Sequence, residues 1–562
     1  MDNIRILLFG ALAFCLLLIW QAWQRDYGPQ PQPIETTAQA PATQGVATPA
    51  AVSDGTIPEV QVAPGAPDIM APTAAPKTEV ITSAVSISVK TDLLDVEISA
   101  QGGEIKNVYL RKYPNSLLTP DDKFQLMTSN LVNRFIAQSG LIGADKETAP
   151  NHEAMYRVAQ QELALSEGED TLEAVLYWTH PSGIKITKRY IFQRGSYEIT
   201  LHHEIENGSN ATWSAREYRQ LQRARPPESQ GSSFIYTYTG AAIYSPEEKY
   251  EKYSFDDMDD AKLSRDVTGG WITMMQHYFL GAWIPPVNER SHYYSSKLAE
   301  GRYLVGMYSP LVSVAEGASH SFTSKLFIGP KLQQEMEDTA PGLELTVDYG
   351  WLTFLAKPIY WLLQKMYSLS NNWGWAIIFL TILIKAGFYK LSEASYKSMA
   401  NMRKLAPRMQ ALKDRYGDDK AAMNQAMMKM YKQEKINPLG GCLPILVQIP
   451  VFIALYWVLL ESVELRQAPF ILWITDLSAK DPYFVLPVIM AASMFIQQKL
   501  NPAPLDPVQA KVMMSLPFVF GIFFAFFPSG LVLYWVVNNL ISITQQWFIT
   551  KKIEQEVSKK SK

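Results

Sequence analysis

Residues 374–392 read GWAIIFLTILIKAGFYKLS, an almost unbroken apolar run that contains one lysine well inside it, Lys385. At about 1.5 Å of rise per residue, a helix of this length approaches the ~30 Å hydrocarbon core of a bilayer. Further apolar runs follow at about 443–463, 483–498, 513–527 and 530–549, with a tight Pro-Ser-Gly turn before the last run. This pattern predicts an α-helical transmembrane bundle.

Residues 4–23 form one more apolar run of spanning length. A cleaved signal peptide is the alternative, but no small-x-small cleavage pattern follows the run. We therefore expect an uncleaved transmembrane anchor over residues 1–25, which brings the predicted spans to six. The runs at 483–498 and 513–527 are short, which favours a locally thinned bilayer.

The composition excludes several classes of protein. The chain has 562 residues, of which 48% are hydrophobic and 19% charged, and its net charge is −3, so wholesale nucleic-acid binding is not indicated. Cys15 and Cys442 are the only cysteines, and no histidine follows His320. A disulfide framework and a cysteine-based zinc site are excluded for the middle of the chain. Nucleotide-hydrolysis and protease motifs are also absent, so we expect no enzyme and no cofactor or metal.

The segment between the anchor and the bundle changes character twice. Residues 26–79 are rich in Pro and Ala and predict a disordered linker. Residues 80–345 carry alternating, aromatic and Thr-rich runs with turn signals between them, which predict an all-β sandwich domain. Residues 350–550 form the predicted helical core. It opens with an amphipathic stretch at 351–366, which fits either an interfacial helix or a lead into the next span.

Positive charge indicates the orientation of the chain. Ten Lys and Arg residues lie between the second and third predicted spans, and more occupy the tail at 551–562, whereas the loop at 464–481 has only Arg466 and Lys480. Cytoplasmic loops carry such an excess. We therefore expect both termini in the cytoplasm and the β-rich domain outside it, in the periplasm of a Gram-negative cell.

Polar side chains accompany Lys385 within the predicted spans. Thr381 lies one turn before Lys385, and Gln448 interrupts the third span. In the last span Tyr534, Asn538 and Ser542 recur every four residues, which places them on one helix face. Snorkelling of the lysine and simple interhelical hydrogen bonds are the alternatives. A polar stripe on three helices together with a lysine favours a hydrated groove.

The stretch 393–437 reads as two amphipathic helices broken near Tyr416-Gly417-Asp418-Asp419, and it is rich in methionine and basic residues. Flexible methionine surfaces suit varied apolar partners, and basic charge suits lipid headgroups or ribosomal RNA. The alternative is a methionine-lined seam between the two helices. The residues that we expect to contact a client or the ribosome are Met399, Met402, Arg403, Lys404, Met427 and Met430.

Three stretches resemble the signatures of YidC-type membrane protein insertases: NPLGGCLP at 437–444, VELRQAPF at 463–470 and FPSGLVLY at 527–534. The resemblance covers about 351–550, and the anchor, linker and β-domain look like the Gram-negative form of the family. It implies a five-helix core with a hydrophilic groove open to the cytoplasm, and it carries groove roles to Thr381, Lys385, Gln448, Tyr534 and Trp535. Two positions depart from the family, because Lys385 replaces its usual arginine and Trp535 often has tyrosine as its counterpart.

The predicted function is therefore that of an insertase and chaperone of the inner membrane, which works on nascent membrane proteins in a lipid bilayer. Asn538 joins the groove residues as a hydrogen-bonding group. The resemblance also implies cooperation with the Sec translocon and with ribosomes, and no small-molecule substrate is expected. A solute transporter with an outer receptor domain is one alternative, although no inverted repeat is apparent. A tethered periplasmic binding module is another.

Overall fold

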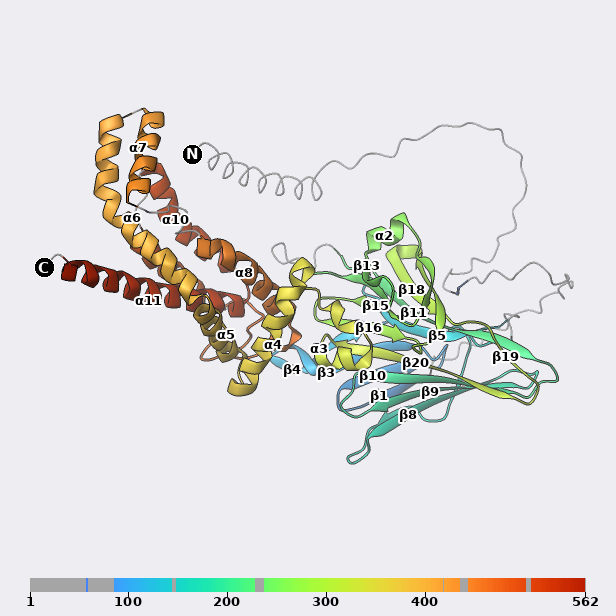
Figure 1. Ribbon diagram of the computed structural model, residues 1–562. Coiled ribbons are helices and arrows are strands. Elements are labelled where there is room, and N and C mark those ends of the chain that lie inside the picture. Colours follow the sequence, from blue (N-terminus) through green and yellow to red (C-terminus); the bar gives the residue numbers. More distant parts are fainter. Residues whose placement is uncertain are drawn as a thin grey trace, which may run out of the picture.

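A computed structural model describes residues 57–58, 85–143, 148–227, 237–417, 419–434, 443–501 and 507–560. The predicted N-terminal anchor and all but two residues of the predicted linker lie outside the described residues, as does most of the 437–444 stretch. The described chain forms a β-rich domain followed by a helical region (Figure 1).

The β-rich domain is a sandwich of two sheets. Strands such as β9 alternate buried and exposed side chains, because successive residues of a strand point to opposite faces. One sheet has eleven strands in the order β14-β17-β18-β11-β5-β3-β2-β1-β7, with β4 paired to β3 and β19 paired to β11. The other has nine strands in the order β13-β12-β15-β16-β20-β10-β9-β8-β6. The core between them includes the fully buried Trp271 and Trp283. The prediction of an all-β sandwich is confirmed.

The bounds of the strands in the eleven-stranded sheet are β1 (Ser86–Lys90), β2 (Leu94–Ser99), β3 (Ile105–Ser116), β4 (Thr119–Met127), β5 (Phe135–Gly143), β7 (Glu162–Ala164), β11 (Trp213–Ala224), β14 (Ser264–Thr268), β17 (Arg290–Lys297), β18 (Arg302–Tyr308) and β19 (Val312–Val314). Those in the nine-stranded sheet are β6 (Arg157–Val158), β8 (Thr171–Thr179), β9 (Ile184–Gln193), β10 (Glu198–Asn207), β12 (Gly240–Ser245), β13 (Lys249–Tyr253), β15 (Trp271–Met275), β16 (Phe279–Ile284) and β20 (Ser319–Pro330). The short helices that accompany the sheets are α2 (Phe255–Asp260), η2 (Ala299–Gly301), α3 (Gln333–Thr339) and η3 (Leu343–Thr346).

The helical region follows the β-domain along the chain. Its elements are η4 (Gly350–Leu352), α4 (Thr353–Ser370), α5 (Trp373–Gly387), α6 (Tyr389–Tyr416), α7 (Lys420–Gln433), α8 (Leu443–Glu461), η6 (Val463–Leu465), α9 (Val485–Leu500), α10 (Pro507–Phe524) and α11 (Ser529–Lys560). Local chemistry explains two of the boundaries. Asn371 takes a left-handed conformation that ends α4, and the Asn372 side chain accepts a hydrogen bond from the Trp375 amide at the start of α5.

The prediction of one continuous helix over 374–392 is wrong at its C-terminal end. α5 stops at Gly387, and the chain turns by 66° before continuing as α6. Gly387 is a weak helix former, and Phe388 leaves the helical region of backbone space with a ψ of 7°. Among the described residues, no single helix is both long and apolar enough to cross a membrane, although the bent pair Trp373–Gly387 and Tyr389–Arg403 qualifies by length and composition. The six spans therefore stay a prediction.

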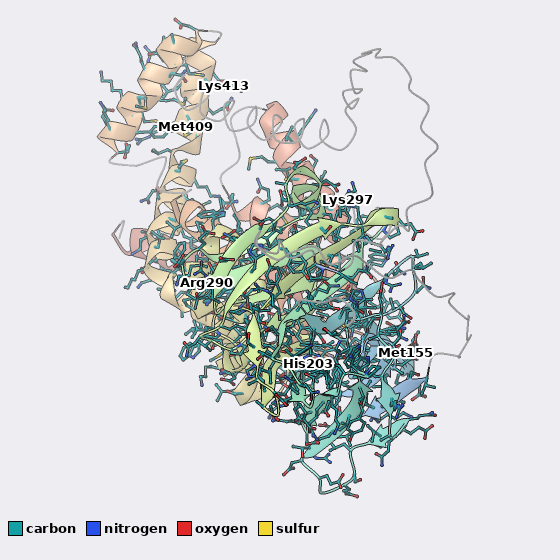
Figure 2. The ribbon with its side chains drawn as sticks, turned by 90° about the vertical axis from the view of Figure 1, so that its right-hand side faces the viewer. Met155, His203, Arg290, Lys297, Met409 and Lys413 are labelled. Carbon is teal, nitrogen blue, oxygen red and sulfur yellow. The ribbon has the colours of Figure 1, made fainter. Side chains whose placement is uncertain are left out.

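The helices pack around α11, which contacts α5, α6, α8 and α9, while α4 contacts α5 and α8. The α6–α7 hairpin projects from the end of this bundle that lies opposite the β-domain (Figure 1). Figure 2 shows the same separation from another side, with Met409 and Lys413 on the hairpin far from His203 and Met155 of the β-domain.

One contact between the β-domain and the helical region involves the residues that follow α8. The Arg466 guanidinium and the Gln467 side-chain amide each donate a 2.8 Å hydrogen bond to the Pro114 carbonyl of β3. The Arg466 guanidinium also lies 5.7 Å from the ring centre of Phe124 and 5.6 Å from that of Phe279. We call this set of contacts the Arg466 latch. It fixes the β3–β4 hairpin to the segment between α8 and α9.

Candidate functional site

Lys385 lies in the last turn of α5 and is only 4% exposed. Its ammonium donates a 2.8 Å hydrogen bond to the Ser542 hydroxyl of α11, and that hydroxyl donates in turn to the Asn538 carbonyl at 2.7 Å. Within the part of the chain that the structure describes, Lys385 forms no ion pair with a carboxylate. A buried ammonium with one neutral partner keeps two N–H groups for a further acceptor.

Thr381 lies one turn before Lys385 and is buried on the same face of α5. Its hydroxyl donates a 2.6 Å hydrogen bond to the Ile377 carbonyl of its own helix. The donor is therefore satisfied, and the acceptor lone pairs of the hydroxyl are what Thr381 offers beside Lys385.

The aromatic members of the predicted site form one cluster between α8 and α11. The Phe452 ring of α8 stacks on Tyr534 at 6.0 Å and meets Trp535 edge-on at 4.8 Å. The Trp535 indole nitrogen is buried and has no hydrogen-bond partner among the described residues. Gln448 is half-buried one helical turn before Phe452, so both lie on the same side of α8.

The structure therefore brings the predicted residues together in two groups. Lys385 is linked through Ser542 to the backbone carbonyl of Asn538, with Thr381 adjacent on α5, and Tyr534 and Trp535 are joined through Phe452. Ser542 was visible in the four-residue spacing of α11 but was not among the predicted site residues. A second polar contact was missed entirely.

That second contact lies on the neighbouring face of α11. The Asn539 amide donates a 3.1 Å hydrogen bond to the buried Ser493 hydroxyl of α9. The signals in the sequence are one serine and one asparagine, each within an apolar run. A hydrogen bond that only packs α9 against α11 explains this pair as well as a functional role does.

The predicted contact residues of the α6–α7 hairpin do not share one surface. Met427 and Met430 are buried, Met399 and Met402 are half-buried, and Arg403 is exposed. The Lys404 side chain lies outside the described residues. An ion pair of 2.6 Å between Arg408 and Glu434 ties α6 to α7. For Met427 and Met430 the structure thus favours the seam between the two helices over a contact surface, and Met428, 46% exposed, faces outward instead.

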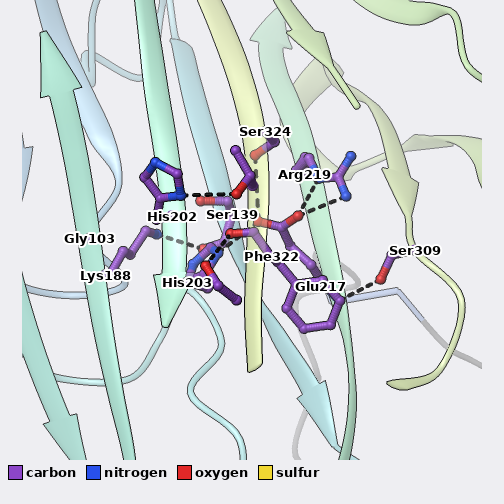
Figure 3. A network of polar contacts seen from close by, with 12 residues as sticks. Gly103, Ser139, Lys188, His202, His203, Glu217, Arg219, Ser309, Phe322 and Ser324 are labelled. Carbon is purple, nitrogen blue, oxygen red and sulfur yellow. Dashed lines mark hydrogen bonds and ion pairs between the residues drawn. The ribbon is translucent and has the colours of Figure 1, made fainter. Parts of the chain in front are cut away.

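Ionisable groups also gather inside the β-sandwich, where the sequence offered no signal (Figure 3). The buried Glu217 carboxylate accepts from the His203 ring at 2.7 Å and from the Arg219 guanidinium at 2.8 Å. The buried Lys188 ammonium donates to the carbonyls of Gly102 at 2.8 Å and Ser139 at 2.9 Å.

The surroundings shift the pKa values of these groups. Burial lowers the pKa of Lys188 to about 7, against the attraction of Glu104 and Glu217. Burial raises the pKa of the Glu217 carboxyl, but the charge of Arg219 and the hydrogen bond from His203 outweigh it, so the net shift is downward. Among the described residues no group of three or more His, Cys, Asp or Glu side chains could hold a metal ion. We assign this network to the core of the domain.

Two family models match adjoining parts of the chain. The model described as the YidC periplasmic domain matches residues 86–362, and the one described as 60Kd inner membrane protein matches residues 365–556. Together they cover the β-domain and nearly all of the helical region.

Full-length relatives agree with these matches. The chain is 51% identical to a membrane protein insertase YidC of Methylococcus capsulatus over 100% of both chains, and 50% identical to that of Thioalkalivibrio sulfidiphilus over 99% of both. A crystal structure of an active YidC insertase is 20% identical, with a TM-score of 0.38 over 83% of this chain and 92% of that one. On the strength of the full-length relatives, the chain belongs to the YidC family of membrane protein insertases.

Proposed function

We propose that this protein inserts newly made proteins into the bacterial inner membrane and assists their folding, alone or with the Sec translocon. The observation that carries the proposal is the buried Lys385 ammonium, whose side-chain partner among the described residues is the neutral Ser542 hydroxyl. An unpaired positive charge at this depth is costly in a membrane protein and marks a functional site. The full-length similarity to proteins named insertases supports the same function.

The proposed topology has six spans, with both termini in the cytoplasm and the β-domain in the periplasm. The basic α6–α7 hairpin and the β-domain lie at opposite ends of the helical bundle, which supports opposite sides of the membrane (Figure 1). α4 would lie in the membrane–water interface on the periplasmic side. In support, Phe354, Trp361 and Leu369 are exposed on one face of α4, whereas Ile359 and Leu363 are buried on the other.

In the proposed mechanism, the polar outer segment of a client enters a groove between α5, α8 and α11 from the cytoplasm. An acidic side chain of the client takes the free N–H groups of Lys385, while Thr381, Gln448 and Asn538 exchange hydrogen bonds with its backbone. The apolar segment passes the cluster of Tyr534 and Trp535. Its release into lipid is favoured by about 25 cal/mol per Å² of apolar surface removed from water, so no nucleotide is required.

The α6–α7 hairpin would meet clients and ribosomes before the groove does. Met399, Met402 and Arg403 are at least partly accessible on α6, and Lys404 follows them in the sequence. Their mixture of flexible apolar and basic side chains suits a nascent apolar segment and the phosphates of ribosomal RNA or lipid. We propose no small-molecule substrate and no cofactor. The alternative of a solute transporter finds no support among the named relatives.

Insertion into proteoliposomes that contain only this protein tests the proposal. Two clients would share one apolar span and differ only in whether their outer tail is acidic or neutral, and protection of the tail from protease would be scored. We expect Lys385→Ala to lower protection of the acidic tail about fivefold, as the loss of about 1 kcal/mol of attraction implies. Lys385→Arg, which keeps the charge, should retain most of it.

Two results would contradict the proposal. Unmodified protein that protects neither tail, although folded and correctly oriented, would overturn autonomous insertion. Unchanged protection of both clients by Lys385→Ala would leave insertion intact but remove the charged groove.

A further inference from the structure

The β3–β4 hairpin ends in an apolar tip. Ser116 of β3 pairs with Thr119 of β4, so Leu117 and Leu118 form the turn between the two strands. Leu118 is 91% exposed, and Leu117 is exposed as well. Turns of hairpins usually carry Gly, Asn, Asp or Ser, and two adjacent exposed leucines at such a point have no structural purpose within the domain.

The Arg466 latch fixes where this tip lies. It holds the Pro114 carbonyl against Arg466 and Gln467, which directly follow the outer end of α8. Leu117 comes three residues after Pro114, and an extended chain rises about 3.3 Å per residue, so the tip reaches roughly 10 Å beyond the latch. Figure 1 shows the β3–β4 hairpin directed toward the bundle end where α4 and α5 meet.

Other exposed apolar side chains surround the same end of the bundle. Leu472 and Tyr483 belong to the segment between α8 and α9, and Phe354 and Trp361 belong to the outward face of α4. A membrane interface favours aromatic rings and amphipathic helices, and it also accommodates an apolar tip. The β3–β4 hairpin and α4 lie at the same end of the bundle (Figure 1), so both can meet one lipid surface.

We infer that Leu117 and Leu118 form a membrane anchor of the β-domain, which enters the headgroup and upper acyl region of the outer-leaflet phospholipids. The inference rests on the membrane placement of α4 under the proposed function. The anchor and the Arg466 latch would together fix the distance of the β-domain from the membrane surface.

Labelling of the full-length protein in nanodiscs tests the anchor. Cys15 and Cys442 would be replaced by serine, and an environment-sensitive dye would be attached through Leu118→Cys. Two further variants serve as references. Phe354→Cys reports on α4, and Val132→Cys, in the turn between β4 and β5, is a matched control because Val132 is apolar and 65% exposed. Phospholipids that carry a nitroxide near the headgroup would quench any dye in the interface.

We expect the dyes at positions 118 and 354 to be quenched several-fold more strongly than the dye at position 132. Adding Leu117→Asp to the Leu118→Cys variant should weaken that quenching, because a carboxylate withdraws from the interface. Quenching at 354 but not at 118 would overturn the anchor and leave the membrane placement of α4 standing. Quenching at neither position would overturn the placement itself. A dye at 118 that is shielded from water but not quenched by lipid would indicate a protein partner and would also overturn the anchor.

Discussion

The Lys385 ammonium and the Ser542 hydroxyl lie 2.8 Å apart, and their hydrogen bond joins the last turn of α5 to the middle of α11. Three residues after Lys385 the chain bends by 66° into α6. The Lys385 ammonium thus has a neutral acceptor on another helix, and among the described residues no carboxylate pairs with its charge.

Introducing a carboxylate at Ser542 should cancel that charge. In Ser542→Asp, an ion pair with Lys385 would form at the site of the present hydrogen bond, and the attraction for an acidic client tail would be lost. We expect protection of the acidic tail to fall about as far as in Lys385→Ala, roughly fivefold, with little change for the neutral tail. Ser542→Ala, which removes the hydroxyl without adding charge, is the control and should retain most activity. Equal insertion by Ser542→Asp and the unmodified protein would contradict this role of the charge.

Regular periodicity made much of the fold predictable. Alternation predicted the β-sandwich, and the Gly-Asp-Asp signal predicted the break of the hairpin where α6 ends at Tyr416 and α7 begins at Lys420. The bend at Phe388 escaped prediction, because a single glycine in an apolar run is a weak signal. The Arg466 latch joins residues 352 positions apart, and such contacts leave no local pattern. Five predicted groove residues stood out as polar groups in apolar runs, whereas Trp535 came from the family resemblance, and their role in a groove stays a prediction. The contacts of Phe452 with Tyr534 and Trp535 left no signal in the sequence.

Removing the Arg466 guanidinium should loosen the β3–β4 hairpin. Arg466→Ala loses the hydrogen bond to the Pro114 carbonyl and both contacts with the Phe124 and Phe279 rings. These contacts are worth about 1–2 kcal/mol, so amide hydrogen exchange within residues 105–127 should accelerate about tenfold. Lys480→Ala, which removes an exposed cation from the same outer segment, is the matched control and should leave the exchange unchanged. Identical exchange in the two variants would contradict the latch.

The buried Lys188 should make the stability of the β-domain depend on pH. Burial lowers the pKa of Lys188 from 10.5 to about 7 in the folded protein. Below pH 7 Lys188 is protonated in both the folded and the unfolded protein, so the folded protein bears the full cost of burying the charge. Above pH 7 Lys188 loses its proton in the folded protein but keeps it in the unfolded protein. The free energy of unfolding should therefore rise with pH, by at most about 1.4 kcal/mol per pH unit. Thermal unfolding between about pH 7 and 9 measures this slope.

Lys188→Met provides the comparison for that slope. Methionine fills a similar volume without a titrating group, although it leaves the carbonyls of Gly102 and Ser139 without their donor. We therefore expect a lower absolute stability but a flatter dependence on pH in the variant. The same slope in both proteins would show that Lys188 does not titrate in this range.

Two neighbouring methionines should respond in opposite ways to a charge. Met427 is buried in the seam of the α6–α7 hairpin, whereas Met428 is exposed. Met427→Asp would bury an unpaired carboxylate and should destabilise the hairpin by about 3 kcal/mol, seen as faster proteolysis within residues 389–433. Met428→Asp should leave proteolysis unchanged. If Met428 contacts clients, crosslinking of an apolar nascent segment to the hairpin should nevertheless fall in this second variant, because the carboxylate replaces an adaptable apolar surface. Unchanged proteolysis of Met427→Asp would contradict the seam, since an exposed position tolerates the charge.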